Sequence, residues 1–352
     1  MMKNSISRMT AFGAVACLLC LQASLTHAAD PQQLFETEVA VPSQAPGLRP
    51  EAFQRALRVV LVRVAGDGAV LSSQPGVALL GDAAALVQQY RYYTAPNSNP
   101  PELKLWVRFD GNAIRNALQR QGMSYWGTER PDTLLWLAVE DRGRRYVVPA
   151  GDDSDVYREI GLAARQRGVP ILFPLMDLED QSQARFSDIW GGFFDHVLKA
   201  SERYNPQAVL IGRLNRSASG GWSSRWYLQA AGRPTTWTDS RPQLDALLQQ
   251  GMEHTADVLA SRFAVASTGG GVNTVSISVD GVNSLAAYAH VKDYLSTLTS
   301  VSGLQLESVD GSTLHFALSL NGSLQDLART AAIGTVIEPV PGGLPGSYRL
   351  RQ

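Results

Sequence analysis

Hydrophobic residues recur along the chain in three blocks, each with its own helical and alternating patterns. In the first block, apolar residues at steps of three and four after Pro50 predict a helix that ends at Gly66 and Gly68. Strict alternation at 103–109 predicts a half-buried strand, with leucine, valine and phenylalanine on one face and lysine, tryptophan and arginine on the other. The other elements predicted in this block are a strand at 34–41, a helix at 76–87, a strand at 89–95 and a helix at 111–121.

The second block carries two unbroken apolar runs, at 134–139 and 208–211. Strands that are apolar on both faces are typical of the centre of a sheet that helices cover on both sides. The strongest helical periodicity in the chain lies at 186–198, and an alternating strand is predicted at 222–230. Further predicted elements are a helix at 154–167, strands at 169–175 and 235–238, and a helix at 242–263. Their order predicts a mixed sheet with helices packed against it.

The third block predicts alternating strands and helices within a short stretch. Asp310 and Gly311 form a strong turn pair between two strands. The predicted elements are strands at 275–279, 304–309, 313–320 and 335–340, and helices at 284–299 and 324–332. This β-α-β-β-α-β order is that of the ferredoxin-like fold.

The predicted fold class is therefore α+β (mixed α/β), with three small modules in series. A run of serine, threonine and glycines gives the clearest boundary, a flexible linker. The predicted divisions are a signal peptide at 1–28, a first module at 30–127, a second module at 128–266, the linker at 267–271, a ferredoxin-like module at 272–340 and a tail at 341–352.

The amino-terminal segment has the pattern of a secretory signal peptide. Lys3 and Arg8 precede an uncharged stretch at 10–25, and small residues follow it. We expect cleavage after Ala28, with Ala29 as the near alternative, and export to the periplasm of a Gram-negative bacterium. An uncleaved anchor is the other interpretation, but the apolar stretch is shorter than the ~20 residues that a membrane span needs.

Composition narrows the chemistry of the exported chain. Both cysteines lie in the predicted signal peptide, so the mature protein has no disulfide and no cysteine-based metal site. Without Lys3 and Arg8, 31 − 2 = 29 basic residues face 32 acidic ones, which gives no electrostatic attraction to nucleic acid. No second apolar stretch is long enough to span a bilayer, so we expect no membrane span after cleavage.

No motif for catalysis or for a cofactor is present. The mature histidines lack the spacing of a helical zinc site, and the glycine patterns that cradle phosphates or dinucleotides are missing. Two acidic clusters remain, and we interpret the one at 152–155 as a helix cap and the one at 177–180 as a solvated turn. The sequence therefore predicts no catalytic residue, no cofactor and no metal.

Aromatic residues are the remaining candidates for a functional surface. Tyr90, Tyr92 and Trp106 make the sheet of the first block unusually aromatic. Core packing and cross-strand pairing explain such residues in most sheets, and an exposed recognition strip is the alternative. These three residues are kept as candidates for an interaction surface.

Short motifs in the first two blocks resemble a known family. They are Glu38-Val39 with Val41, Ala56-Leu57, Val62-Arg63-Val64 with Gly66, Gln89-Tyr90-Arg91-Tyr92, Val107-Arg108-Phe109-Asp110, Trp126, Arg130-Pro131 and Trp136. Together they resemble the uncharacterised proteobacterial envelope family called domain of unknown function 2066, over about 34–220. The resemblance implies no activity. Trp126, Arg130 and Trp136 would mark the junction of the first two modules, where an arginine stacks on aromatic rings.

Fold-level similarities point to protein binding. Through the segment 204–212, the second block is similar to the small α/β domain of the Tol translocation protein's amino-terminal region and of the curli-secretion and penicillin-binding-protein-activator lipoproteins. The β-α-α-β-β order of the first block is similar to the polypeptide-transport modules of outer-membrane assembly machinery. Those families bind proteins, although fold alone does not fix function.

The sequence thus favours a non-catalytic periplasmic protein that binds another envelope protein through the edges of its sheets. One alternative is an enzyme or small-ligand binder with a site between the first two modules, built from groups such as Arg130, Asp141 and Arg142. Another is a structural or peptidoglycan-contacting role. An enzyme would have a closed pocket with converging polar groups, whereas a binding module would have shallow surfaces and an uncovered sheet edge. The sequence does not identify the partner protein or the oligomeric state.

Overall fold

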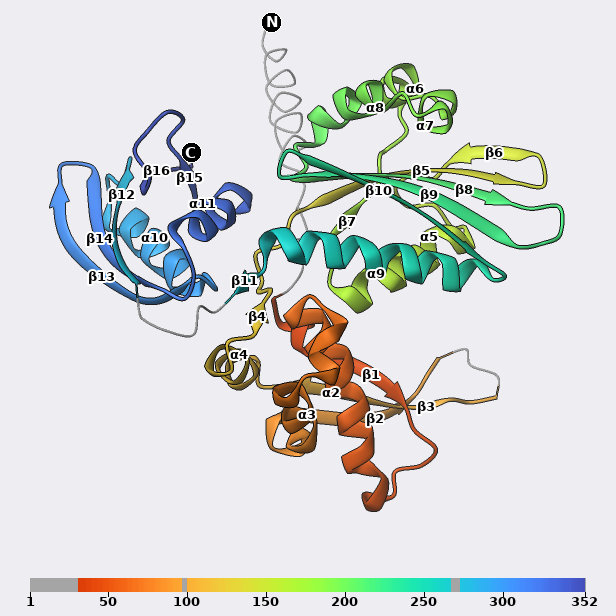
Figure 1. Ribbon diagram of the computed structural model, residues 1–352, viewed down its shortest axis with the longest axis horizontal. Helices are drawn as coiled ribbons and strands as arrows, with labels where there is room; N and C mark the ends of the chain where they lie inside the picture. Colours follow the sequence, from red (N-terminus) through yellow and green to blue (C-terminus); the bar gives the residue numbers. More distant parts are fainter. Residues whose placement is uncertain (1–30, 97–99, 267–272, 352) are drawn as a thin grey trace, which may run out of the picture. The chain divides into compact units, whose positions relative to one another are not determined.

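The computed structural model describes residues 31–96, 100–266 and 273–351 (Figure 1). Within these ranges the fold is α+β, with ten α-helices and four β-sheets of three, six, two and five strands. The predicted fold class is confirmed. The predicted signal peptide, its cleavage site and the linker at 267–271 lie outside the described residues. None of the helices in the described ranges combines the length and the hydropathy that a membrane crossing requires.

The first sheet is antiparallel, with its strands in the order β1-β3-β2. The strands are β1 (Glu36–Ala40), β2 (Val87–Thr94) and β3 (Leu103–Phe109). Helix α2 (Arg49–Ala65) covers one face and buries its apolar side against Leu105 and Val107. The helix ends at Gly66, whose φ is 81° and where a Cβ atom would lie 2.3 Å from the Cβ of Ala260. This position therefore needs glycine for both its conformation and its space.

Two boundaries in this part differ from the predictions. The strand expected at 34–41 begins only at Glu36, because the preceding residues form a 3-10 turn. The helix expected at 76–87 is α3 (Gln74–Gly81), and Val87 already belongs to β2. The closing helix α4 (Gly111–Arg120) is confirmed, with Asp110 as its N-cap.

The second sheet has the order β10-β9-β8-β5-β6, and β7 also pairs with β5. Its strands are β5 (Thr133–Asp141), β6 (Arg144–Val147), β7 (Ile171–Leu172), β8 (Ala208–Arg216), β9 (Trp222–Ala230) and β10 (Arg233–Arg241). Strands β5 and β8 are parallel, and β9 and β10 continue the sheet in antiparallel pairs.

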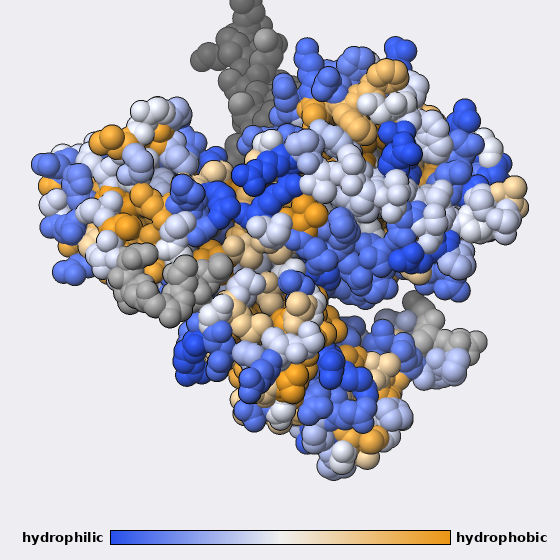
Figure 2. Space-filling view, in the orientation of Figure 1, coloured by the Kyte–Doolittle hydropathy of each residue, from blue (hydrophilic) through white to orange (hydrophobic). Residues whose placement is uncertain are grey.

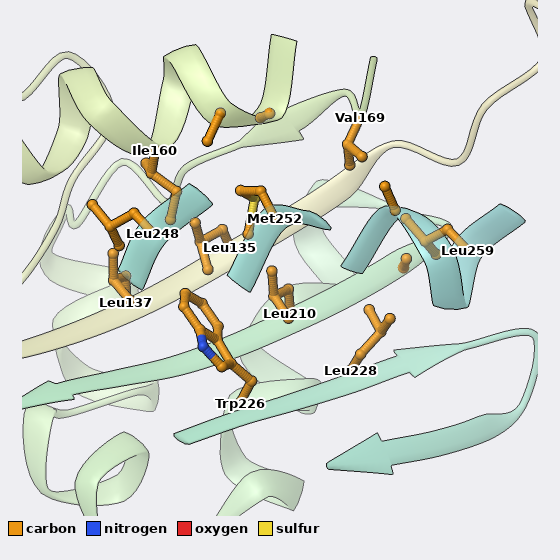
Figure 3. Packing of buried hydrophobic residues seen from close by; sticks show 14 of the residues in the cluster. Leu135, Leu137, Ile160, Val169, Leu210, Trp226, Leu228, Leu248, Met252 and Leu259 are labelled. Atoms are coloured by element: carbon orange, nitrogen blue, oxygen red, sulfur yellow. The ribbon is translucent and has the colours of Figure 1, made fainter. Parts of the chain in front are cut away.

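Helices cover both faces of this sheet, as the unbroken apolar runs predicted. Leu135 and Leu137 point into a layer with α5 (Asp155–Arg167) and α9 (Leu244–Phe263), part of which Figure 3 shows. The alternate residues of β5 point into a second layer with α7 (Phe186–Gly191) and α8 (Phe194–Ser201). Because side chains of a strand alternate between its faces, a strand buried on both sides is apolar throughout.

Several elements of this part differ from the predictions. The single helix expected at 186–198 is split into α7 and α8, because Gly192 adopts a left-handed φ of 82°. The strand expected at 169–175 is reduced to the two residues of β7. Strand β6 was not predicted, since its arginine-rich edge sequence carries no apolar run. The short helix α6 (Leu178–Gln183) lies where an acidic turn was expected.

The two-stranded sheet pairs β4 (Ser124–Tyr125) with β11 (Val265–Ala266). It joins the two ends of the segment that forms the second sheet. The next residue after β4, Trp126, donates its backbone N–H to the carbonyl of Val64 at 2.7 Å. The chain between the first and second sheets is thus hydrogen bonded to α2.

The five-stranded sheet has the order β13-β14-β12-β16-β15. Its elements are β12 (Asn273–Asp280), α10 (Leu285–Thr297), β13 (Val301–Asp310), β14 (Thr313–Leu320), α11 (Leu324–Ile333), β15 (Ile337–Pro339) and β16 (Ser347–Leu350). The predicted β-α-β-β-α-β order is present, but the expected tail at 341–352 contains β16. This strand is parallel to β12 and separates it from β15.

The packing of Tyr348 shows why the end of the chain forms a strand. Its side chain is only 1% exposed and belongs to the core of the five-stranded sheet. Its hydroxyl is buried without a hydrogen-bond partner among the described residues. The ring therefore stabilises the sheet, whereas the hydroxyl does not.

Substitutions at Tyr348 should separate these two contributions. Tyr348→Ala should lower the free energy of unfolding by about 3–5 kcal/mol, because a large buried ring is lost. Tyr348→Phe should leave it unchanged or raise it, because only an unpaired hydroxyl is removed. Urea unfolding of both variants measures this. Equal stability of Tyr348→Ala and the unmodified protein would show that β16 does not contribute to the core.

Candidate functional site

Arg130 is buried where several backbone segments meet. Its side chain is 8% exposed, and its guanidinium lies 4.0 Å from the ring centroid of Trp126. A guanidinium has five N–H donors, and each of them donates to a carbonyl oxygen at 2.9 to 3.0 Å. The acceptors are the carbonyls of Arg63, Trp126, Gly127, Arg167 and Gly168. We call this arrangement the arginine clamp. It leaves no donor of Arg130 free for a ligand.

Arg63 supports the clamp from α2. It donates to the carbonyl of Gln166 at 2.9 Å and to three carbonyls at 33–36. Burial lowers the pKa of Arg63 to about 10 and that of Arg130 to about 9. Repulsion from Arg167 adds to the effect at Arg63, and repulsion from Arg63 adds to it at Arg130. Both remain charged at neutral pH, and carbonyl dipoles stabilise the charges. In the sequence, Arg63 was named only as part of the Val62-Arg63-Val64 motif and not as a candidate site residue, although it lies next to the apolar face of its helix.

Trp136 does not join Trp126 and Arg130, contrary to the expectation that all three mark one junction. Its indole donates to the hydroxyl of Ser201 at 2.9 Å within the α7–α8 layer. Trp126 instead packs in the layer of Leu135. The reason is the alternation of β5, which directs neighbouring side chains to opposite faces.

The alternative site of Arg130, Asp141 and Arg142 is not assembled. Arg130 precedes β5, whereas Asp141 ends it and Arg142 lies in the following turn, with a φ of 50°. A strand of this length spans roughly 25 Å, so the three side chains cannot converge on one small molecule. Asp141 pairs instead with Arg216 at 3.4 Å.

The first sheet places its candidate aromatic residues on two faces. Tyr90 and Tyr92 are opposite Val107 and Leu105, on the face that α2 covers. The ring of Tyr90 lies 5.4 Å from that of Phe53 and 6.2 Å from that of Tyr92. Trp106 belongs to the other face, which points away from the core that α2 forms with this sheet. The predicted aromatic set is therefore not one continuous strip.

The face around Trp106 is a shallow surface of arginines and an aromatic ring. The guanidinium groups of Arg91 and Arg108 lie 4.9 and 5.3 Å from the centroid of the Trp106 ring. Arg108 also donates to the carboxylate of Glu36 at 2.7 Å. Together with Gln89, these side chains line a surface hollow of about 660 Å³. We call this the open face of the first sheet.

Strand β2 is an edge of the same sheet. The N–H of Ala95 donates to the carbonyl of Glu102 at 2.8 Å, which fixes which cross-strand pairs are hydrogen bonded. Because bonded and non-bonded pairs alternate, the backbone groups of Tyr90, Tyr92 and Thr94 point away from β3. In the ranges that the structure describes, no strand pairs with this side of β2. Such an edge is a template for another strand.

The acidic cluster at 177–180 is not the solvated turn that the sequence suggested. Asp180 is 1% exposed and accepts hydrogen bonds from the N–H of Met176 at 2.8 Å and the hydroxyl of Tyr204 at 2.5 Å. Arg203 lies 3.1 Å from Asp180 and 2.9 Å from Asp177, which caps α6. The side-chain partners Arg203 and Tyr204 lie more than twenty residues away in sequence, so no local pattern reveals the burial. The cluster anchors α6 to the end of α8.

These contacts shift two pKa values in this cluster. Hydrogen bonds from the Arg203 guanidinium lower the pKa of Asp177 to about 2. Burial, together with the hydrogen bond to Asp180, raises the pKa of Tyr204 to about 12. Every donor and acceptor named here serves the fold, so we assign no catalysis to this cluster.

Large apolar side chains are also exposed near α6 and α8. Leu175, Leu178 and Phe193 are 60%, 85% and 59% exposed, and Figure 2 shows hydrophobic residues at the surface over these helices. Isolated apolar residues at a surface are common. Exposure alone does not mark a site here.

The second acidic cluster caps a helix, as predicted. Ser154 accepts a hydrogen bond from the N–H of Tyr157 at 3.2 Å, and Asp152 accepts one from the Ser154 hydroxyl at 2.5 Å. Among the described residues, no group of three or more histidine, cysteine, aspartate or glutamate side chains is placed to hold a metal ion.

The comparisons bear on the first sheet. Residues 28–127 match the model of a domain of unknown function (DUF8605). This is an uncharacterised family, but it is not the domain of unknown function 2066 that the sequence motifs suggested. The motifs describe short strands and a helix, which many small α/β modules share. No curated protein matches the chain. The DUF8605 match includes the open face and β2, and it ends before Arg130.

The arginine clamp should be sensitive to a substitution that keeps its charge. Arg130→Lys should lower the free energy of unfolding by about 3 kcal/mol, because a lysine ammonium cannot reach five separate carbonyls. The control is Arg142→Lys in the exposed β5–β6 turn, which should change it by less than about 0.5 kcal/mol. Urea unfolding of both variants tests the difference. Equal losses in the two variants would argue against the clamp.

The low pKa of Asp177 predicts a specific acid sensitivity. A carboxyl whose pKa is lower in the folded state stabilises the fold above its unfolded pKa, ~3.9, and loses this effect as the pH falls through about 2. Asp177→Asn keeps an N-cap side chain but lacks the charge. The variant should be less stable than the unmodified protein at pH 7, and the difference should shrink between pH 4 and pH 2. A difference that urea unfolding finds constant over this range would contradict the ion pair.

Proposed function

We propose that this chain is a non-catalytic protein of the cell envelope whose first sheet binds an extended segment of another envelope protein. The observation that carries the proposal is the outer side of β2, where the backbone groups of Tyr90, Tyr92 and Thr94 have no strand partner among the described residues. A bound segment would add a fourth strand and satisfy these groups, which is the β-augmentation mode of peptide recognition.

The side chains around β2 would supply specificity. On the open face, Arg91 and Arg108 flank Trp106, and Arg91 has no carboxylate within ion-pair distance among the described residues. On the opposite face, Tyr90 presents a partly exposed ring. Alternate residues of a partner strand would therefore meet a cationic aromatic surface on one side and a tyrosine on the other.

Other features support the envelope assignment and a binding role. The basic start, apolar stretch and small residues before Ala29 favour export to the periplasm with cleavage after Ala28. We place three small modules in series behind this signal. Among the described residues, the buried charged side chains are Arg63, Arg130 and Asp180, and all three are occupied by contacts within the fold.

Site-specific crosslinking in living cells tests the proposal. A photoreactive amino acid at exposed Gln89 on β2 should form a discrete protein adduct in the periplasmic fraction, whereas one at exposed Ser219 should not. Thr94→Pro removes an outward N–H without loss of a bond to β3, and it should abolish the Gln89 adduct. An unchanged adduct with Thr94→Pro, or no adduct from Gln89, would rule out β2 as the binding edge.

A further inference from the structure

A second groove, separate from the first sheet, lies between α5 and the segment that contains β7. Its volume is about 390 Å³, within the ~300–1,000 Å³ range of ligand pockets. One wall is the α5 face formed by Tyr157, Gly161 and Arg165, which recur at four-residue steps. The other wall is Ile171 and Phe173, and most of the lining is apolar. Nothing in the proposed function uses this groove.

The backbone beside the groove is an open strand edge. The N–H of Thr133 donates to the carbonyl of Pro170 at 3.0 Å, and β7 is parallel to β5 from Ile171 onward. Backbone groups of successive residues alternate in direction, so those of Ile171 and Phe173 point away from β5. Among the described residues, β7 pairs with no strand other than β5. An extended peptide can therefore continue the sheet at this position.

Gly161 keeps the groove open. It lies inside α5, where glycine costs ~1 kcal/mol relative to alanine. A Cβ atom at this position would lie 3.3 Å from Nη1 of Arg165. A side chain at this position would narrow the groove and require the guanidinium of Arg165 to shift by a few tenths of an ångström.

The charge at the groove is not balanced. Arg158 forms an ion pair with Asp155. Arg165 is exposed and has no ion-pair partner within the described ranges. It lies in the last turn of α5, close in sequence to the start of β7. A peptide that pairs antiparallel with β7 runs towards that start, so its carboxyl end would arrive at Arg165.

From this geometry we infer that the α5–β7 groove binds the free carboxyl terminus of an extended peptide. The peptide pairs antiparallel with β7 through the backbone groups of Ile171 and Phe173. Its last apolar side chain fills the hollow over Gly161, and its terminal carboxylate binds the guanidinium of Arg165. The ligand class is thus a protein chain that ends in an aliphatic or aromatic residue.

Binding of short peptides to the full-length exported protein tests this inference. The probes are four fluorescent hexapeptides that end in leucine, isoleucine, valine or phenylalanine, each as a free acid and as an amide. At least one free acid should bind saturably in fluorescence anisotropy, and its amide should bind at least tenfold more weakly. Absence of saturable binding by all four free acids, or equal binding of acid and amide, would overturn the inference.

Variants of the α5 wall provide the second part of the test. Arg165→Gln and Gly161→Leu should each weaken binding at least tenfold, and Gly161→Leu should not unfold the helix because leucine is a better helix former than glycine. The matched control is Arg120→Gln, an exposed arginine in the last turn of α4, which should leave binding unchanged. Thr94→Pro on β2 should also leave it unchanged, so this test and that of the proposed function fail independently. Unchanged binding by Arg165→Gln would contradict the carboxylate contact.

Discussion

The guanidinium of Arg130 is the polar interaction on which the described structure most depends. It donates to the carbonyl of Arg63 in the last turn of α2 and to the carbonyls of Arg167 and Gly168 at the end of α5. The final carbonyls of a helix have no partner within the helix, and the helix dipole makes them attractive to a cation. A buried charge is costly when it is unpaired. In this chain one side chain satisfies two helix ends, and those carbonyls in turn stabilise its charge.

The parts of the fold that follow from local sequence are those in which the pattern of neighbouring residues already determines how their side chains pack. The apolar run of β5 predicted a strand with helices on both faces, because successive side chains point alternately into the two hydrophobic layers. The helical periodicity at 186–198 predicted one helix. Gly192 ends the first helix with a left-handed φ, which the spacing of apolar residues does not reveal. Strand β16 and the burial of Asp180 depend on partners far along the chain. Local patterns cannot identify such partners.

The candidate site shows the same division. Sequence alternation correctly separated Trp106 from the apolar face of β3, and the aromatic content of the first block was evident. It did not reveal that β2 lies at an edge, because the order β1-β3-β2 is set by pairing between distant strands. The exposed backbone of Tyr90 and Tyr92 is consequently a property of topology. Their side chains alone favoured core packing and cross-strand pairing, with an exposed recognition strip as the alternative, whereas their position favours strand addition.

The end of α5 links the internal clamp to the outer groove. Arg167 gives its carbonyl to Arg130, while Arg165, two residues earlier in the same turn, lies on the groove. A shift of this turn towards a ligand would stretch the hydrogen bonds to Arg130, so the turn is held in place before a ligand arrives. Rigid presentation of this kind reduces the ordering cost of binding. Arg130, whose five donors are all occupied by carbonyls, therefore also fixes the position of the exposed Arg165.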